Sequence, residues 1–450
     1  MSSLMHPKNK TFQVCLLLIA ALAFGGGGSG TGLANLCVQL AALTLAALNL
    51  DAFIDFFRTA PRLLTSLVGI SLLLPLLQSL PLPPFVWQSL PGRELAVQSL
   101  KLVDASEDWR PLSLEVHRTL IAFLSLIPAA TALVLSWSMT SREKQMVMAG
   151  LALSGGALVL AGIPQLASGN HRFVFYAEAL GSDDLHGFFA NRNTAGLFLD
   201  MALCALIGSI PSQRPAPKWI AASASLALLL ILGLVLTRSR SSMALAVIPF
   251  VFASYRILRA RKGAGISASR KQRFAILGAC VLLAGTATAA GLMNDRLQAS
   301  FTRFENLDDR RPEIWKDSLG AIQRFWPVGS GIGTFDEVFQ LDESLEFLGP
   351  GRAARAHNDY LEVALESGAI GIALLSAWVV YLALLAIRAL QRGPATQAAL
   401  AILILITFQS ISDYPMRNQT ILCIAGFILA ALAQTPRLRS RNSPTQETAD

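Results

Sequence analysis

The chain is poor in charge: Asp, Glu, Lys and Arg make up only 15% of its 450 residues. A soluble domain carries about a quarter charged residues, so this composition excludes an ordinary soluble protein. Apolar residues make up 53% of the chain. Apolar runs of about 20 residues, the length that crosses a bilayer, recur along most of it. The sequence therefore predicts an integral membrane protein.

Several functional motifs are also missing. The five cysteines lie in apolar runs without a CxxC pair or a nearby histidine, which is typical of buried apolar side chains. No P-loop or HExxH motif occurs. The acidic pairs Asp183-Asp184 and Asp308-Asp309 have no histidine at metal-ligand spacing, so we expect both to be solvated, with a metal site as the less favoured alternative. We predict no metal and no cofactor. The lack of a basic arm argues against nucleic-acid binding.

The apolar runs predict an all-α fold, a polytopic membrane bundle of about 12 transmembrane helices. Lys8 and Lys10 precede the first run without a convincing small-residue cleavage site, so we expect this helix to be retained. The predicted helices cover residues 11–28, 33–52, 62–80, 118–137, 145–164, 186–210, 219–236, 241–257, 274–293, 368–390, 397–412 and 419–435.

The basic residues predict the orientation. If the N-terminus is cytoplasmic, most basic residues of the short connections fall on the cytoplasmic side, as the positive-inside rule requires. The short outer connections then hold only Arg172, Arg192, Arg238, Arg240 and Arg417. Both termini are therefore expected in the cytoplasm.

The predicted helices divide the chain into four parts. Residues 1–293 hold nine helices and an outer loop at about 81–117, and residues 294–367 form a second, larger outer loop. Residues 368–435 hold the last three helices, and 436–450 form a disordered cytoplasmic tail. A connection as long as the second loop usually has structure of its own. We expect short helices there, lying across the outer mouth of the bundle.

Three groups suited to phosphate chemistry would meet on that outer face. Arg240 lies in a tight turn, Arg311 in the large loop, and His357 at the end of that loop. The planar guanidinium binds phosphate oxygens through two hydrogen bonds and keeps its charge. Two arginines could neutralise a departing pyrophosphate, and a histidine could accept a proton from an attacking hydroxyl. We predict Arg240, Arg311 and His357 as catalytic residues.

Further polar residues nearby are predicted to bind the substrate. Arg192 extends the arginine group, and Asn193 shares a helix face with Asp200, seven residues on. An acid so deep in an apolar helix tends to face the bundle interior, and structural and functional roles of Asp200 are equally open. The predicted substrate-binding residues are Arg192, Asn193, Arg238, Arg355, Asn358 and Tyr360.

Each catalytic candidate also has a structural explanation when it is taken alone. Arg238 and Arg240 could contact lipid headgroups at a helix end. Arg311 could form a solvated ion pair with a neighbouring acid. His357 could cap the following helix or hydrogen-bond to a carbonyl. The site hypothesis therefore depends on whether these side chains converge.

Seven short motifs, each weak alone, occur in an order and spacing typical of one family. They are Trp109-Arg-Pro-Leu-Ser113, Gly187-Phe-Phe-Ala-Asn-Arg-Asn193, Ser239-Arg240, Arg311-Pro-Glu-Ile-Trp315, Gly329-Ser-Gly-Ile-Gly333, His357-Asn358 and Asp413-Tyr-Pro-Met-Arg417. Through them the chain resembles the bacterial O-antigen ligase and polysaccharide polymerase superfamily. Many relatives carry a histidine where this chain has Thr194, so no role of that histidine transfers.

The resemblance implies an inverting, metal-independent glycosyltransferase in the bacterial inner membrane, with its active site in the periplasm. The donor would be a glycan on undecaprenyl pyrophosphate, held by Arg240 and Arg311, while His357 activates the acceptor hydroxyl. The acceptor is lipid A-core for a ligase and another lipid-linked repeat unit for a polymerase. The motifs Asn191-Arg-Asn193 and Asp413-Tyr-Pro favour polymerase or exopolysaccharide assembly, and a protein acceptor stays open.

A flippase or another polytopic transporter is the alternative function. Twelve spans suit a transporter, and Asp200 is the one residue in its favour. The sequence has no duplicated halves and no paired broken helices, which many transporters show. A purely structural membrane protein is the third possibility.

Overall fold

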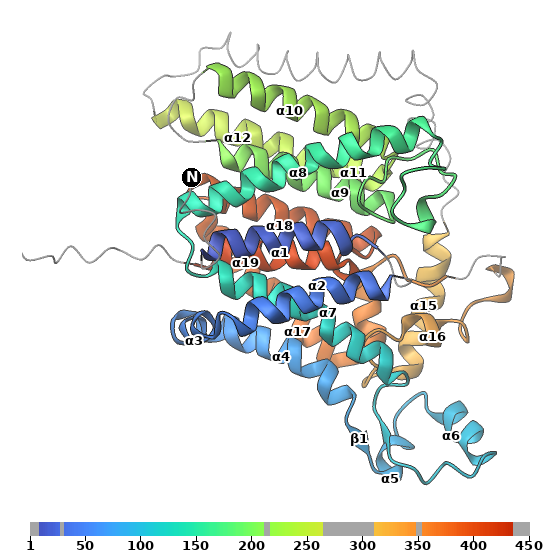
Figure 1. Cartoon of the computed structure of the whole chain (residues 1–450). Coiled ribbons are helices and arrows are strands. Elements are labelled where there is room, and N and C mark those ends of the chain that lie inside the picture. Colours follow the sequence, from blue (N-terminus) through green and yellow to red (C-terminus); the bar gives the residue numbers. More distant parts are fainter. Residues whose placement is uncertain (1–8, 28–30, 211–216, 264–309, 348–352, 435–450) are drawn as a thin grey trace, which may run out of the picture.

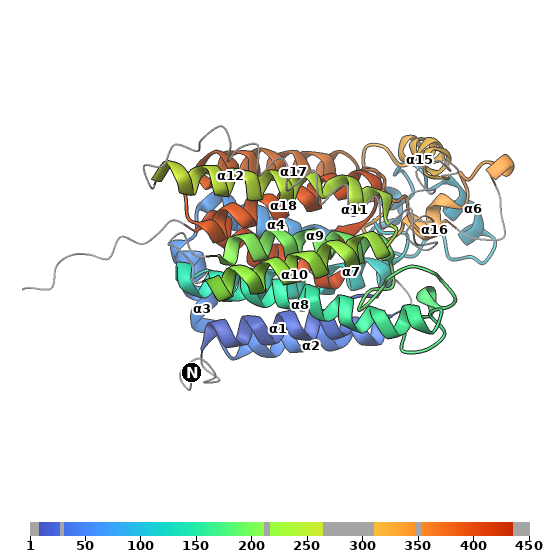
Figure 2. The same ribbon diagram turned by 90° about the horizontal axis from the view of Figure 1, so that it is seen from above.

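The computed structural model describes residues 9–27, 31–210, 217–263, 310–347 and 353–434. Long helices run side by side in a bundle (Figure 1), and the view from above shows the same arrangement (Figure 2). The short elements α5, α6, α15 and α16 gather at one end of the bundle, and α3 lies at the other. Apart from one two-stranded ribbon, the described residues form helices, turns and loops.

The elements follow one another in two sets. The first set is α1 (Lys10–Phe24), α2 (Gly32–Ala47), α3 (Leu50–Thr59), α4 (Arg62–Gln78), β1 (Pro81–Leu82), α5 (Pro84–Trp87), α6 (Glu94–Lys101), β2 (Arg110–Pro111), α7 (Val116–Ser136), α8 (Ser141–Ala167), η1 (Ala177–Ala179) and α9 (Arg192–Ser209). The second set is α10 (Pro217–Leu236), α11 (Arg240–Leu245), α12 (Val247–Gly263), α15 (Arg311–Phe325), α16 (Phe335–Phe339), η2 (Leu345–Phe347), α17 (Asp359–Ala389), α18 (Pro394–Ser412), η3 (Pro415–Arg417) and α19 (Gln419–Ala433).

The helices confirm an all-α integral membrane protein. Among the described residues, six helical segments are long and apolar enough to cross a membrane: α7, α8, α10, Arg240–Arg259, α17 and α18. A seventh is added if α2 and α3, which are bent by 78°, count as one span. Helices α1, α4 and α19 are apolar but shorter. The predicted count of about twelve spans is not confirmed, and the predicted helix 274–293 lies outside the described residues.

The centre of the bundle is formed by α9 and α19, most of whose residues are buried. Helix α19 packs on α7, and α9 packs between α8 and α18. Close approach depends on small residues: a Cβ at Gly426 would lie 2.1 Å from the carbonyl oxygen of Ala129. Because lipid supplies little hydrophobic drive between helices, such tight packing is a main source of their association.

Helix α17 starts nine residues before the predicted helix 368–390. Its backbone breaks at Gly368, where φ is 53° and ψ is −141°. A Cβ at that position would lie 2.1 Å from the carbonyl oxygen of Pro327, so the left-handed turn and the close contact both require glycine. The predicted boundary therefore coincides with a kink. The extra segment, Asp359–Ser367, carries three acids toward the candidate site.

The two expected outer loops contain short elements. In the first, β1 pairs antiparallel with β2, with Pro81 opposite Pro111 and Leu82 opposite Arg110. In the second, α15, α16 and η2 are the short helices that the sequence predicts. The buried Arg93 joins the loops, since its guanidinium donates to the carbonyls of Leu112 and, at 3.4 Å, Gly329. Burial lowers the pKa of Arg93 to about 10.

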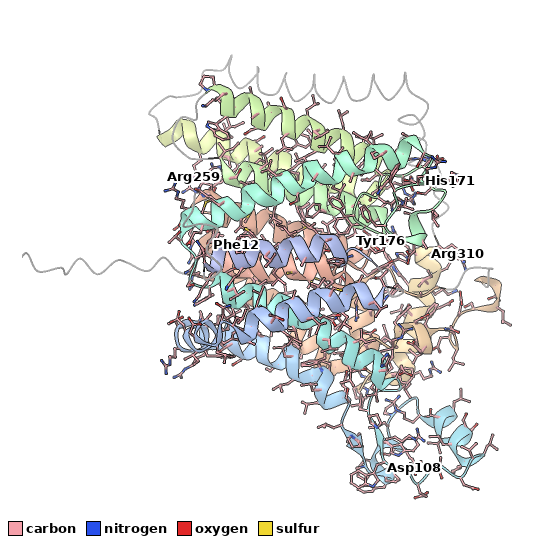
Figure 3. All side chains as sticks on the ribbon, viewed as in Figure 1. Phe12, Asp108, His171, Tyr176, Arg259 and Arg310 are labelled. Carbon is pink, nitrogen blue, oxygen red and sulfur yellow. The ribbon has the colours of Figure 1, made fainter. Side chains whose placement is uncertain are left out.

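The end of the bundle with the short helices also holds the candidate site. Figure 3 places His171, Tyr176 and Arg310 at the end with the short helices and Arg259 at the opposite end. The glycine run 329–333 is a turn packed against α17, where the amide of Gly331 donates to the carbonyl of Glu366 at 2.9 Å. The candidate site lies at this same end.

Candidate active site

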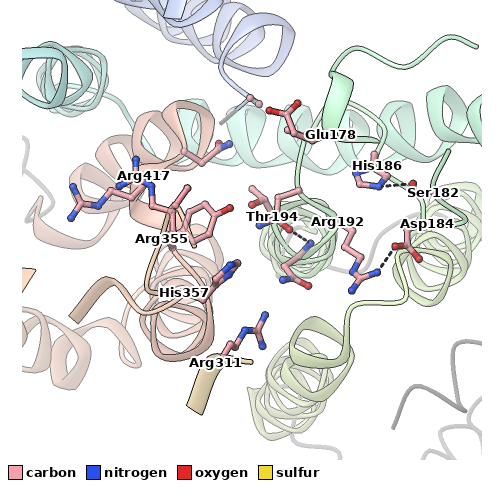
Figure 4. A pocket seen from close by; sticks show the side chains of 18 of the residues that line it. Glu178, Ser182, Asp184, His186, Arg192, Thr194, Arg311, Arg355, His357 and Arg417 are labelled. Atoms are coloured by element: carbon pink, nitrogen blue, oxygen red, sulfur yellow. Dashed lines mark hydrogen bonds and ion pairs between the residues drawn. The ribbon is translucent and has the colours of Figure 1, made fainter. Parts of the chain in front are cut away.

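A cavity of about 670 Å³ opens at the end of the bundle that carries α15. Its lining residues come from five parts of the chain: 26–27, 178–194, 310–314, 354–357 and 414–418. Figure 4 shows His357, Arg311 and Arg355 around one side of this space, with Arg192 and Asp184 across from them. A cavity of this size can hold a ligand or part of one.

His357 is held in place by a buried acid. Its Nδ1 lies 3.2 Å from Oδ1 of Asp413, a residue that is only 2% exposed. The other carboxylate oxygen, Oδ2, accepts a hydrogen bond from Nδ2 of Asn191 at 3.2 Å. A carboxylate at Nδ1 favours the tautomer with its proton there and leaves Nε2 as the acceptor. His357 has a positive φ of 50°, a conformation in which histidine is enriched. The arrangement suits a general base.

The Tyr414 ring packs beside this pair. Its centroid lies 5.0 Å from that of the imidazole, and it lines the cavity. Burial, followed by the neighbouring Asp413, raises the pKa of Tyr414. The phenol therefore stays protonated near neutral pH, and the ring is a neutral wall beside His357.

Five arginines line the cavity and come from four parts of the chain: Arg192, Arg310, Arg311, Arg355 and Arg417. Arg311 stands at the start of α15, and Arg192 at the start of α9. Arg355 precedes α17, where its guanidinium lies 6.0 Å from the centre of the Tyr414 ring. Guanidinium groups from four directions can surround an anion that has several oxygens, such as a pyrophosphate.

Two of these arginines are anchored by buried acids on one face of α17. Arg417 lies 2.6 Å from Glu366, 3.1 Å from Glu362 and 3.9 Å from Asp359. The acids are spaced i, i+3 and i+7, which places them on one helix face. Glu362 also accepts from Arg355 at 3.1 Å.

This charge balance explains why Arg417 stays ionised. Burial lowers its pKa, but the surrounding carboxylates outweigh that effect and raise the pKa above the ordinary value. A buried charge is tolerated when it is paired and hydrogen-bonded in this way.

The predicted solvation of the acidic pair 183–184 is wrong for Asp184. Its carboxylate is buried, forms an ion pair with Arg192 and lies 3.6 Å from Arg238. The turn after α10 packs against this segment, since the amide of Leu185 donates to the carbonyl of Leu236 at 2.9 Å. That packing brings Arg238 to a carboxylate that also pairs with Arg192, eight residues further along the same segment. The pair 308–309 lies outside the described residues.

Arg192, Asn193, Arg311, Arg355 and His357 are the predicted site residues that line the cavity. Among the residues that the structure describes, the lining does not include Arg238 or Arg240. The turn that holds both is tied to the site, because Ser239 donates to Oδ1 of Asn193 at 2.9 Å.

The other two predicted binding residues have structural contacts. Oδ1 of Asn358 accepts from the amides of Tyr360 and Leu361 at 3.0 and 3.2 Å, so Asn358 caps α17. The Tyr360 hydroxyl donates to the carbonyl of Thr407 at 2.7 Å and ties α17 to α18. The capping role considered for His357 therefore belongs to its neighbour.

Several residues of the site were missing from the sequence prediction: Glu178, Asp184, His186, Asp413 and Arg417. Asp413 and Arg417 are the first and last residues of the motif Asp413-Tyr-Pro-Met-Arg417, so the motif could have identified both. Within the described ranges, no group of three or more His, Cys, Asp or Glu residues is arranged to hold a metal ion.

Asp200 lies apart from this site. It is fully buried in α9, and neither of its carboxylate oxygens has a hydrogen-bond partner among the residues described. It does not belong to the cavity lining that the structure describes. Its place in the centre of the bundle agrees with the expected inward orientation.

His186 predicts a pH effect on stability. Burial lowers its pKa, although Asp184 raises it in part, and its Nε2 lies 3.0 Å from Ser182 Oγ. The unfolded chain therefore takes up this proton first as the pH falls below about 6.5, and the free energy of unfolding decreases. Thermal unfolding in detergent should show a larger loss between pH 7.5 and 5 for the wild type than for His186→Gln. Equal losses would contradict this assignment.

One family comparison bears on the chain. Residues 225–376 match the family model described as O-Antigen ligase, and this stretch contains Arg240, Arg311 and His357. A search of curated proteins finds no match. The family implies a membrane glycosyltransferase of the ligase or polymerase type, with a lipid-linked glycan donor and a glycan acceptor. The match supports the resemblance inferred from the motifs: residues 225–376 are similar to the O-antigen ligase family.

Proposed function

We propose that the protein transfers a glycan from undecaprenyl pyrophosphate to an acceptor hydroxyl, with inversion, at the periplasmic face of the bacterial inner membrane. In this proposal both termini are cytoplasmic, and the segments 81–117 and 294–367 are periplasmic. One observation supports it above the others: His357, held by Asp413, opens onto the same cavity as Arg192, Arg311, Arg355 and Arg417.

The reaction follows from this arrangement. The acceptor hydroxyl gives its proton to Nε2 of His357 as its oxygen attacks the anomeric carbon of the donor glycan. The new glycosidic bond forms on one face of the sugar while the bond to the pyrophosphate oxygen breaks on the other. Asp413 stabilises the imidazolium that results. No step in this scheme requires a metal or another cofactor.

The arginines act on the leaving group. Negative charge grows on the pyrophosphate as the bond breaks, and guanidinium groups already in place stabilise it without reorganisation. We assign donor binding to Arg192, Asn193, Arg311 and Arg355, with Arg238 positioning Asp184 and Arg192. Arg240 remains a pyrophosphate ligand that the motif resemblance implies. Asn358 and Tyr360 support the site by fixing the start of α17.

Two acceptors fit this proposal. A ligase would transfer the glycan to lipid A-core, and a polymerase would transfer it to another lipid-linked repeat unit or a growing exopolysaccharide. The lipid-linked material in a deletion strain separates them, because loss of a ligase leaves long chains on the carrier whereas loss of a polymerase leaves single repeat units.

Arg311→Ala tests the proposal in the native cell. We expect little surface polymer and an accumulation of lipid-linked precursor on the periplasmic side, because the departing pyrophosphate loses a cation that lines the cavity. Arg172→Ala is the matched control: it removes an exposed arginine from the connection between α8 and α9, and polymer should stay near the wild-type level. Periplasmic precursor is measured by its accessibility to an added glycosidase in intact spheroplasts.

The same experiment tests the alternative, a flippase of the lipid-linked glycan. Precursor confined to the cytoplasmic side in Arg311→Ala cells would contradict the glycosyltransferase and support transport. Unchanged polymer in both variants would contradict both functions. Asp200, the residue that favoured a transporter, is enclosed in the bundle instead of in the cavity.

A further inference from the structure

Helix α3 lies across the end of the bundle that is opposite to the cavity (Figures 1 and 2). It follows α2 after a bend of 78°. Since α2 runs along the bundle with the candidate membrane-spanning helices, α3 lies close to the plane of the membrane.

One face of α3 is fixed to the bundle. Ala52 and Phe56 are buried, and the Phe56 ring meets the Trp137 ring edge-on at 5.2 Å between centroids. The Trp137 indole donates to the hydroxyl of Thr59 at 2.9 Å. These contacts set the rotation of the helix about its own axis and therefore the direction of its other faces.

A second face is charged. At 100° per residue, Asp51, Asp55 and Arg58 lie on one side of the helix. The Asp51 side chain is 77% exposed and forms an ion pair with Lys10 at 3.6 Å. This face suits water or lipid headgroups.

A third face is apolar and exposed. Leu50, Ile54 and Phe57 are spaced i, i+4 and i+7, and they are 65%, 52% and 64% exposed. The stripe is continuous in the chain with exposed apolar residues on both sides, Leu48 before α3 and Leu63 at the start of α4. A helix with a core face, a charged face and an apolar face is typical of a membrane interface.

We propose that α3 is an in-plane helix that binds phospholipid at the boundary between headgroups and acyl chains. Leu50, Ile54 and Phe57 enter the acyl region, and Asp51, Asp55 and Arg58 face the headgroups and water. Phospholipid is the partner because the stripe continues the apolar surface of the membrane-embedded helices. This inference does not depend on the glycosyltransferase reaction.

Spin labels on the reconstituted protein test the proposal. A nitroxide is attached to Ile54→Cys or Phe57→Cys in full-length protein carrying Cys37→Ser, in phosphatidylethanolamine–phosphatidylglycerol vesicles. The signal of the unsubstituted Cys37→Ser protein is subtracted. Collisions with oxygen report the acyl region, and collisions with a water-soluble nickel chelate report the aqueous phase. Asp51→Cys, on the charged face of the same helix, is the matched control.

We expect the oxygen-to-nickel collision ratio to be several-fold higher at positions 54 and 57 than at position 51. Equally low ratios at all three positions would place the stripe in water and overturn the proposal, and equally high ratios would contradict the assignment of Asp51 to the headgroups and water. Low collision rates with both reagents at 54 and 57 would show that protein, either a second copy or another partner, covers the stripe, and would also overturn it. The nickel collisions at position 51 verify that α3 keeps its native orientation.

Discussion

Replacing His357 by alanine should reduce glycan transfer by about 10²- to 10⁴-fold, the usual contribution of a positioned general base. The cavity keeps its arginines in this variant, so the donor still binds and the loss falls on kcat. The rate is measured with purified protein and lipid-linked glycan extracted from a deletion strain. His171→Ala is the control, since that histidine is exposed on the connection between α8 and α9, and it should transfer at the wild-type rate.

A substitution of Asp413, the hydrogen-bond partner of His357, tests the role of the imidazole more specifically. Asp413→Asn keeps the shape of the side chain but removes the negative charge 3.2 Å from Nδ1. We expect kcat to fall while the KM for the donor stays the same, because the imidazolium formed during attack loses its counter-charge. If His357→Ala and Asp413→Asn both transfer at the wild-type rate, His357 is not the base.

Replacing Arg417 by methionine should destabilise the protein by about 3–5 kcal/mol, the cost of leaving a buried ion pair without one partner. Asp359, Glu362 and Glu366 would then face one another in the protein interior without a cation between them. The midpoint of thermal unfolding in detergent measures the effect. Arg388→Met is the control, because Arg388 is exposed, and substitutions at such positions usually change stability by less than about 0.5 kcal/mol.

A second substitution shows whether charge is the cause. Glu366 is the acid closest to Arg417, at 2.6 Å. Combining Arg417→Met with Glu366→Gln removes one of the uncompensated charges, so the double variant should be more stable than Arg417→Met alone. A double variant that is less stable would indicate that lost packing, and not electrostatics, explains the effect of Arg417→Met.

Hydropathy predicted a helix well where that helix consists of one continuous run of apolar residues. Helices α7, α8 and α18 lie close to their predicted ranges because a run of apolar residues depends on local composition alone. The bend at Gly368 depends on contact with Pro327 in another part of the chain. A hydropathy profile shows the polar residues before Gly368 but cannot show that they already form helix.

The site was predicted only in part, because the sequence shows local motifs but not contacts between distant residues. His357 and Arg311 belong to local motifs, and the sequence identified both. The acid that orients His357 is 56 residues away, and the one that pairs with Arg192 had been assigned to solvent. The pairing of His357 with Asp413 arises only when distant parts of the chain pack together. Arg311 lines the cavity, whereas Arg240 is not among its described lining residues. The sequence alone gave no reason to expect this difference.

In the proposed reaction, the carboxylates behind Arg355 and Arg417 have a consequence for the end of the catalytic cycle. Glu362 and Glu366 compete with any bound anion for the same guanidinium groups. Arginines without neighbouring acids would bind the pyrophosphate carrier tightly after transfer of the sugar. The nearby carboxylates lower the affinity of these arginines for the carrier. The buried acids thus favour turnover, since release of product limits the rate of many enzymes.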